Sequence, residues 1–213
     1  MRPLQLFSWS LMTVLALGLF ISTFMYLGFR TDVNFLLQKQ HLINHPVWMP
    51  AFYVHIITGM LAIAIGPFQF LKRFRNRNLS LHRKLGKAYV AAILFLAAPT
   101  GLYMAFFAEG GWLSSLGFVL MSGLWFYTTW QALATVRKGN ISAHKKWMIR
   151  SYAMTFSAVT LRLLVPLFSI GFGFDALFVV VSTAWISWAL NLLIAETLIL
   201  WTTRSLTPKY SHP

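Results

Sequence analysis

Six apolar runs separated by short polar segments constrain this chain more than any other feature of its sequence. A run of about 20 apolar residues is the length that an α-helix needs to cross the hydrocarbon core of a bilayer. The runs cover residues 6–29, 51–71, 85–107, 112–136, 147–170 and 175–202. The sequence therefore predicts an all-α fold, a polytopic membrane helix bundle with six transmembrane helices that form a single transmembrane domain, residues 1–213.

Charged residues are few, and most of them are basic. Lys and Arg number 18 against four Asp and Glu, and together they make up 10% of the chain, whereas soluble domains carry about 25%. Because the basic residues lie in the short segments between apolar runs, the expected polyanion is the anionic headgroup layer of a lipid bilayer, and not nucleic acid. The chain has no Cys, which excludes disulfides, thiolate metal sites and iron–sulfur clusters.

Two of the connecting segments are strongly basic. Residues 72–87 hold seven Lys and Arg and residues 137–150 hold five, whereas the turns around Glu109 and Asp175 hold none. The positive-inside rule places both basic segments and both termini in the cytoplasm, so the anionic headgroups that they meet belong to the cytoplasmic face. The expected location is the bacterial cytoplasmic (inner) membrane, with residues 30–50 as the one sizeable extracytoplasmic connection.

Each basic segment carries one His at the mouth of a helix that runs outward, His82 and His144. Two His from different helices are what bis-imidazole ligation of a haem iron requires, so the pair predicts an inner haem b site. His55 is expected to belong to a second site nearer the outer face. The alternative interpretation is that these are ordinary hydrogen-bonded or solvated interfacial residues. The basic residues expected to bind the haem propionates are Arg83, Lys87 and Arg150.

Arg162 is expected roughly two turns from the outer end of the fifth helix. A charge at that depth is costly and needs a partner, and no acidic side chain is expected at the same level. Arg162 therefore predicts an outward-facing pocket for a quinone headgroup or an anion, lined also by Thr100 and Tyr103. Glu196 is the one acidic residue of the inner half, and its simplest expected role is to pair with Arg150 or with a Lys.

Several short blocks carry a resemblance to a known family. They include GPFQF at residues 66–70, HR-x-x-G from His82 and H-x-x-W-x-x-R-S-Y from His144. Across residues 51–165 the chain resembles the uncharacterised bacterial membrane family called domain of unknown function 2306. The resemblance implies a multi-helix inner-membrane protein and carries over no catalytic residue. More distantly, the chain is similar to two-haem b-type transmembrane cytochromes, from which it departs by lacking a core His on the fourth helix.

Three interpretations of function stay open from these features. The first is an integral membrane protein that holds haem b and exchanges electrons with a quinone or a protein redox partner. The second is a small permease or a carrier of anions or metabolites that uses Arg162 in an outward cavity. The third is an accessory or assembly subunit of a larger membrane complex.

Overall fold

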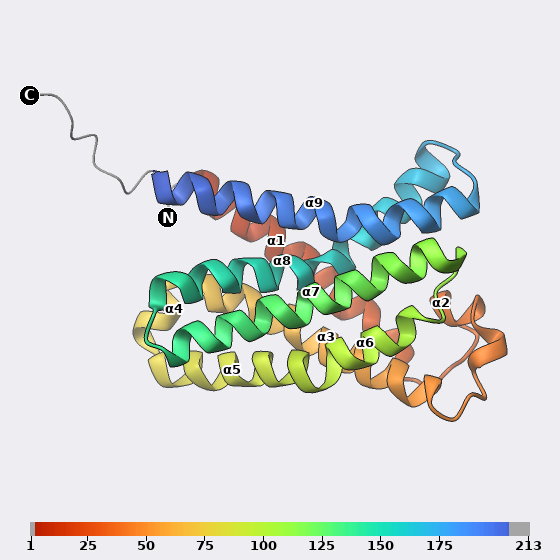
Figure 1. The fold of residues 1–213 in the computed structure, drawn as a ribbon, viewed down its shortest axis with the longest axis horizontal. Helices are drawn as coiled ribbons and strands as arrows, with labels where there is room; N and C mark the ends of the chain where they lie inside the picture. The colour runs from red at the N-terminus through yellow and green to blue at the C-terminus, as the bar shows by residue number, and fades with distance from the viewer. Residues whose placement is uncertain (1–2, 205–213) are drawn as a thin grey trace, which may run out of the picture.

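The protein folds as a set of long helices joined by short turns (Figure 1). The computed structural model describes residues 3–204, and it contains no strand within them. The predicted all-α fold is therefore confirmed. The long helices are α1 (Pro3–Thr23), α3 (Trp48–Phe70), α5 (Leu79–Ala91), α6 (Ala98–Ala105), α7 (Gly111–Arg137), α8 (Ile141–Pro166) and α9 (Ala176–Arg204). The short elements are η1 (Phe24–Tyr26), α2 (Asn34–Leu37), η2 (Gln40–Leu42), α4 (Lys72–Arg77), η3 (Ala92–Ala97) and η4 (Leu167–Gly171).

Five helical segments among the described residues are long and apolar enough to cross a membrane. They are Leu6–Tyr26, Trp48–Phe70, Leu79–Ala105, Ile141–Gly171 and Ala176–Thr203. The sixth expected span, 112–136, lies within α7, which has 27 residues but is not among the five. Helix α7 contains polar residues that make its sequence less apolar. Several of their side chains are buried in the bundle and so kept away from lipid: Ser114, Ser122, Thr128 and Thr129.

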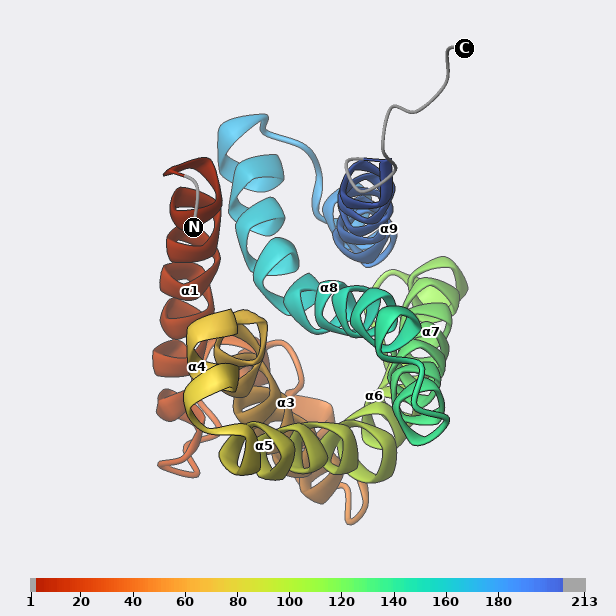
Figure 2. The ribbon, with the colours of Figure 1, turned by 90° about the vertical axis from the view of Figure 1, so that its left-hand side faces the viewer.

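Four helices surround the centre of the molecule. Viewed from the end, α5 and α8 lie on opposite sides of this centre, with α3 and α7 between them (Figure 2). Helix α3 packs against α5 and α8, and α7 packs against α6 and α8. Helices α1 and α9 lie outside this group, α1 against α3 and α9 against α7 and α8. The centre of the bundle is therefore lined by α3, α5, α7 and α8.

Two π-helical segments interrupt the spans beside prolines. Segment η3 leads into α6, where Pro99 occupies the first turn, and η4 follows directly on Pro166 at the end of α8. Proline lacks the N–H that would continue the helical ladder and clashes with the preceding turn, and a wider π turn accommodates the disruption. The irregular segment of the third span therefore lies immediately before Pro99.

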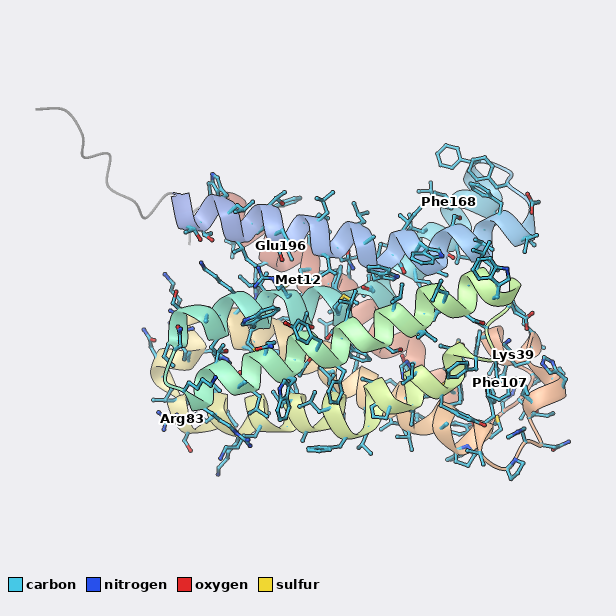
Figure 3. The ribbon with its side chains drawn as sticks, in the orientation of Figure 1. Met12, Lys39, Arg83, Phe107, Phe168 and Glu196 are labelled. Carbon is cyan, nitrogen blue, oxygen red and sulfur yellow. The ribbon has the colours of Figure 1, made fainter. Side chains whose placement is uncertain are left out.

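The connection between α1 and α3 is held against the bundle by a buried lysine. Lys39 is 2% exposed, and its Nζ donates to the carboxylate of Glu109 and to the carbonyl of Phe107, both at 2.6 Å. Figure 3 shows Lys39 and Phe107 together at the outer end of the molecule. The segment before α3 is thereby held against the turn between α6 and α7.

The helices that carry the paired histidines begin earlier than the hydropathy pattern indicates. Helix α5 starts at Leu79 and α8 at Ile141, each six residues before the expected starts at 85 and 147. The expectation that His82 precedes its helix is therefore wrong, because His82 lies within the first turn of α5. An Asn comes directly before each helix, and Asn140 caps α8 by accepting a hydrogen bond from the Ala143 N–H at 3.0 Å.

Candidate functional site

His82 and His144 occupy equivalent positions in two matching sequence blocks. The blocks read NLSLH from Asn78 and NISAH from Asn140, so each His is the fourth residue of its helix. In both, the His N–H donates to the Asn carbonyl at 2.9 Å. The repeated block is visible in the sequence, but the prediction of the histidine site did not depend on it. It places one imidazole on α5 and one on α8 at the same end of the bundle.

The His144 ring is fixed by a hydrogen bond to the neighbouring helix α7. Its Nδ1 lies 2.8 Å from the carbonyl oxygen of Ala132. A carbonyl can only accept, so Nδ1 carries the hydrogen and the neutral ring keeps its lone pair on Nε2. Histidines that ligate metals are oriented by this kind of bond from the other ring nitrogen. His144 is thus held in the tautomer that a ligand requires.

Two buried polar atoms near the start of α5 have no hydrogen-bond partner among the described residues. They are Nδ1 of His82 and Nε2 of Gln69. Gln69 lies beside Gly86, one turn after His82, where an added Cβ would sit 3.5 Å from the Gln69 Oε1 atom. A buried polar group without a partner costs about 1–3 kcal/mol, so such groups commonly mark a place for a ligand or for ordered water.

The two histidines share one region of the bundle interior. They lie within electrostatic range of each other, on the helices that face each other across the centre (Figure 2). Further along α5, the Tyr89 hydroxyl bonds to Ser151 at 3.0 Å and to Thr155 at 2.8 Å on α8. Polar side chains of these two spans therefore meet at these three residues.

A layer of buried hydrogen bonds divides the inner histidines from the outer half of the bundle. Thr155, which already bonds to Tyr89, also accepts a hydrogen bond from Trp125 of α7, whose Nε1 lies 3.0 Å from Thr155 Oγ1. Thr129 of α7 bonds to Ser151 at 2.7 Å. Three helices are thereby tied together in mid-bundle, which fixes the distance between α5 and α8.

The basic residues around the histidines differ in how their charge is balanced. Arg150 forms two hydrogen bonds to Glu196, of 2.5 and 2.8 Å, and its guanidinium lies 4.5 Å from the centre of the Trp147 ring. The predicted pairing of Glu196 is therefore confirmed, with Arg150 as its partner. Arg83 and Lys87 are exposed, and neither has an acidic partner within residues 3–204. Figure 3 shows Arg83 at the inner end of the molecule and Glu196 along α9.

His55 lies on α3 in the outer half of the bundle, and its ring is closely packed. Its Nδ1 lies 2.8 Å from the Ala97 carbonyl, and the ring meets Trp125 edge-on at 6.2 Å between centroids. A Cβ at Gly101 would come within 2.9 Å of the His55 Cε1 atom. His45, the other histidine near this end of α3, accepts from the Trp48 N–H at 3.1 Å through its Nδ1 and so acts as a helix cap.

The structure brings Arg162 and His55 into one neighbourhood. Arg162 lies within electrostatic range of His55 and of Tyr26, and its side chain is exposed. Its Nη1 donates to the carbonyl of Ala158, one turn back, at 3.1 Å. Its charge meets no acidic side chain in the described part of the chain.

The other two residues expected around Arg162 are engaged elsewhere. Thr100 donates to the Leu96 carbonyl at 2.6 Å, and the Tyr103 ring packs against Phe107 at 5.2 Å between centroids. Within residues 3–204 no hydrogen bond joins either of them to Arg162. No group of three or more His, Asp or Glu side chains in this range is arranged to hold a metal ion.

Comparison with known proteins gives one match. A family model described as "Predicted membrane protein (DUF2306)" matches residues 52–199. No curated protein and no solved structure matches the chain. The matched range includes both His blocks, the mid-bundle hydrogen bonds and Arg162.

Proposed function

This chain belongs to the DUF2306 family of membrane proteins, and on that premise we propose that it binds one haem b at the inner end of its bundle. The bound haem would pass electrons to or from a quinone or a protein partner. The family description assigns no activity, so the proposal depends on the site. The observation that carries it is the matched pair of histidines at one end of the bundle, on two helices that face each other across its centre (Figure 2).

The residues around the pair suit a bis-imidazole haem. Nε2 of His144 is left with its lone pair because Nδ1 donates to a carbonyl, and the ring nitrogen Nδ1 of His82 is buried without a partner. Gly86, one turn after His82, keeps that face of α5 free of a side chain. Of the three cations expected to bind propionates, Arg83 and Lys87 have no acidic partner among the described residues, whereas Arg150 is neutralised by Glu196. When bound, the haem would itself accept and release one electron reversibly.

The orientation in the membrane follows from the distribution of charge. The first turn of α1 and the last turn of α9 lie at the same end as α4 and the turn between α7 and α8 (Figure 1). With α7 as a sixth spanning helix, the basic end faces the cytoplasm of a bacterial inner membrane, and so do both termini. Because the chain has no Cys, single cysteines can report this orientation. Val47→Cys should react with an impermeant maleimide in intact cells and Lys138→Cys only after lysis, and the reverse pattern would contradict the orientation.

Haem binding is tested by substituting the histidines one at a time. Purified from cells supplied with haem precursor, the protein should carry one haem per chain by pyridine haemochrome assay. His82→Ala and His144→Ala should each lose most of it, whereas the control His41→Ala, exposed in the outer connection, should retain it. Retention of full haem content by both inner variants, or its absence from the unsubstituted protein, would exclude the proposal.

A second function, an anion carrier, is favoured by Arg162. A guanidinium within a membrane span needs an anion, carbonyls or water around it, and here one bond to a backbone carbonyl is all that the described residues give it. An anionic substrate or a quinone oxygen entering from outside would meet Arg162 beside His55. Arg162→Gln should then abolish uptake of the anion, or reduction of the quinone, whereas Arg162→Lys should preserve part of the same activity. Equal activity in all three proteins would remove the basis for this role.

A further inference from the structure

A groove at the cytoplasmic end of α3 combines cationic and apolar walls. Its volume is about 640 Å³, and it is lined by Phe68, Leu71, Arg73, Phe74, Arg77 and Asn78. These residues come from the last turn of α3, from α4 and from the residue before α5. Leu71 has extended backbone angles, φ −75° and ψ 110°, so the chain turns away from the axis of α3 at this point. The groove lies where the chain leaves its apolar span.

The groove carries two arginines whose charges are not balanced within the described chain. Arg73 and Arg77 are four residues apart on α4, which places them on one face of the helix, and both are exposed. All four acidic residues of the protein are used elsewhere. Asp32, Glu109 and Glu196 form ion pairs with Arg30, Lys39 and Arg150, and Asp175 caps α9 at its first turn. Each acidic side chain of the protein is therefore engaged away from this arginine pair.

The apolar wall indicates what kind of anion this is. Phe68 is 44% exposed although it ends an apolar span, and its ring lies 6.2 Å from the ring of Phe74. A free phosphate ion gains nothing from the exposed ring of Phe68 or the partly buried ring of Phe74. A phospholipid has both a phosphate and an apolar glycerol and acyl region, and headgroups lie at the level where spans end.

We propose that this groove binds one anionic phospholipid, with its phosphate between Arg73 and Arg77 and its acyl region against Phe68 and Phe74. Arginine suits this task because its planar fork can donate two parallel hydrogen bonds to one phosphate. The volume is within the range of about 300–1,000 Å³ that is typical of small-molecule sites. The groove adjoins the start of α5, since Asn78 lines it and accepts from the His82 N–H, but the lipid proposal uses neither histidine, so neither proposal depends on the other.

Native mass spectrometry of the detergent-solubilised protein tests the site. Titration with phosphatidylglycerol should give one tightly held lipid per chain, and phosphatidylcholine should bind much more weakly. The double variant Arg73→Gln/Arg77→Gln should bind phosphatidylglycerol at least about tenfold more weakly, since loss of one hydrogen bond to a charged group is enough for a change of that size. The matched control Arg137→Gln/Lys138→Gln removes the same charge from exposed residues of the other basic segment, and its affinity should change less than about twofold, within what surface charges contribute.

Three results would overturn the proposal. Equal losses in the two double variants would mean diffuse attraction to a basic surface, and equal binding of phosphatidylcholine would remove the role of charge. Displacement of the lipid by glycerol 3-phosphate at matched concentration would identify a site for a free anion. A photoactivatable phosphatidylglycerol gives a readout that needs no variant. It should crosslink the unsubstituted protein within residues 68–78, and crosslinks spread over all spans would contradict a defined groove.

Discussion

Substitution of Gly66 by Ala should destabilise the bundle at the contact between α3 and α8. The Tyr152 ring of α8 lies directly on Gly66, where an added Cβ would come within 1.8 Å of the ring carbon Cε2. The ring is buried, and its hydroxyl donates to the Ile63 carbonyl at 3.2 Å. The ring therefore has to move, and its hydrogen bond is strained or lost when it does.

The expected size of the effect follows from three contributions. Overpacking a buried contact costs about 1–3 kcal/mol, and losing a hydrogen bond inside a membrane protein costs about 0.6 kcal/mol. Replacing Gly by Ala within a helix gains up to about 1 kcal/mol. The free energy of unfolding should therefore fall by about 1–3 kcal/mol, the first contribution being the largest.

A matched control lies two turns earlier on the same helix. At Gly59 an added Cβ has no atom within 4 Å, so Gly59→Ala should leave stability unchanged or raise it by up to about 1 kcal/mol. Reversible unfolding in mixed micelles, followed by Trp fluorescence, measures both variants. The reasoning is refuted if Gly66→Ala is as stable as Gly59→Ala. Adding Tyr152→Leu to Gly66→Ala should restore part of the loss by removing the clashing ring.

Three further outcomes can be measured in the same way. Tyr89→Phe removes two hydrogen bonds between α5 and α8 and should lower the free energy of unfolding by about 1 kcal/mol; an unchanged value would mean that the bonds are not formed. Lys39→Met should cost about 1–3 kcal/mol because it leaves a carbonyl and a carboxylate unpaired, and it should speed tryptic cleavage after Arg30, the site in this segment that both proteins retain, whereas equal cleavage there would argue against the anchoring role. The exposed Arg30 lowers the pKa of Asp32, chiefly by hydrogen bonding to its carboxylate. The sign of this shift favours the folded state above the ordinary Asp pKa, and this effect is lost as pH falls, but exposure to solvent makes the contribution too small to measure. Both side chains are more than half exposed, so Asp32→Asn should leave unfolding unchanged within error, and a clear loss would contradict that.

The sequence predicts the spans well because hydrophobicity is a strong signal along one dimension. It predicts the starts of α5 and α8 poorly, because a hydropathy reading ends a span at the first Lys or Arg. Lys and Arg are good helix formers, and their long side chains can reach the headgroups from within a helix. The Asn before each helix, Asn78 and Asn140, was the local signal for the true starts.

The sequence indicated which residues belong to the candidate site, but it did not indicate how the helices that carry them are placed relative to one another. Pairing of Glu196 with Arg150 could be expected from depth, because few acidic residues were available. The opposite placement of α5 and α8 depends on packing among four helices, which one sequence does not show. The same applies to burial of Lys39, since a basic residue in an outer connection is ordinarily solvated. Arg162 and His55 were expected at one level, and the structure places them within electrostatic range of each other.

The most direct test of the central claim is the low-temperature electron paramagnetic resonance spectrum of the oxidised protein, purified from cells supplied with haem precursor. Two imidazoles on one iron give a low-spin ferric haem. If His82 and His144 are the ligands, the spectrum should show one low-spin species, at one haem per chain, which is lost in His82→Ala and in His144→Ala. A high-spin signal, or protein without haem, would contradict bis-histidine ligation.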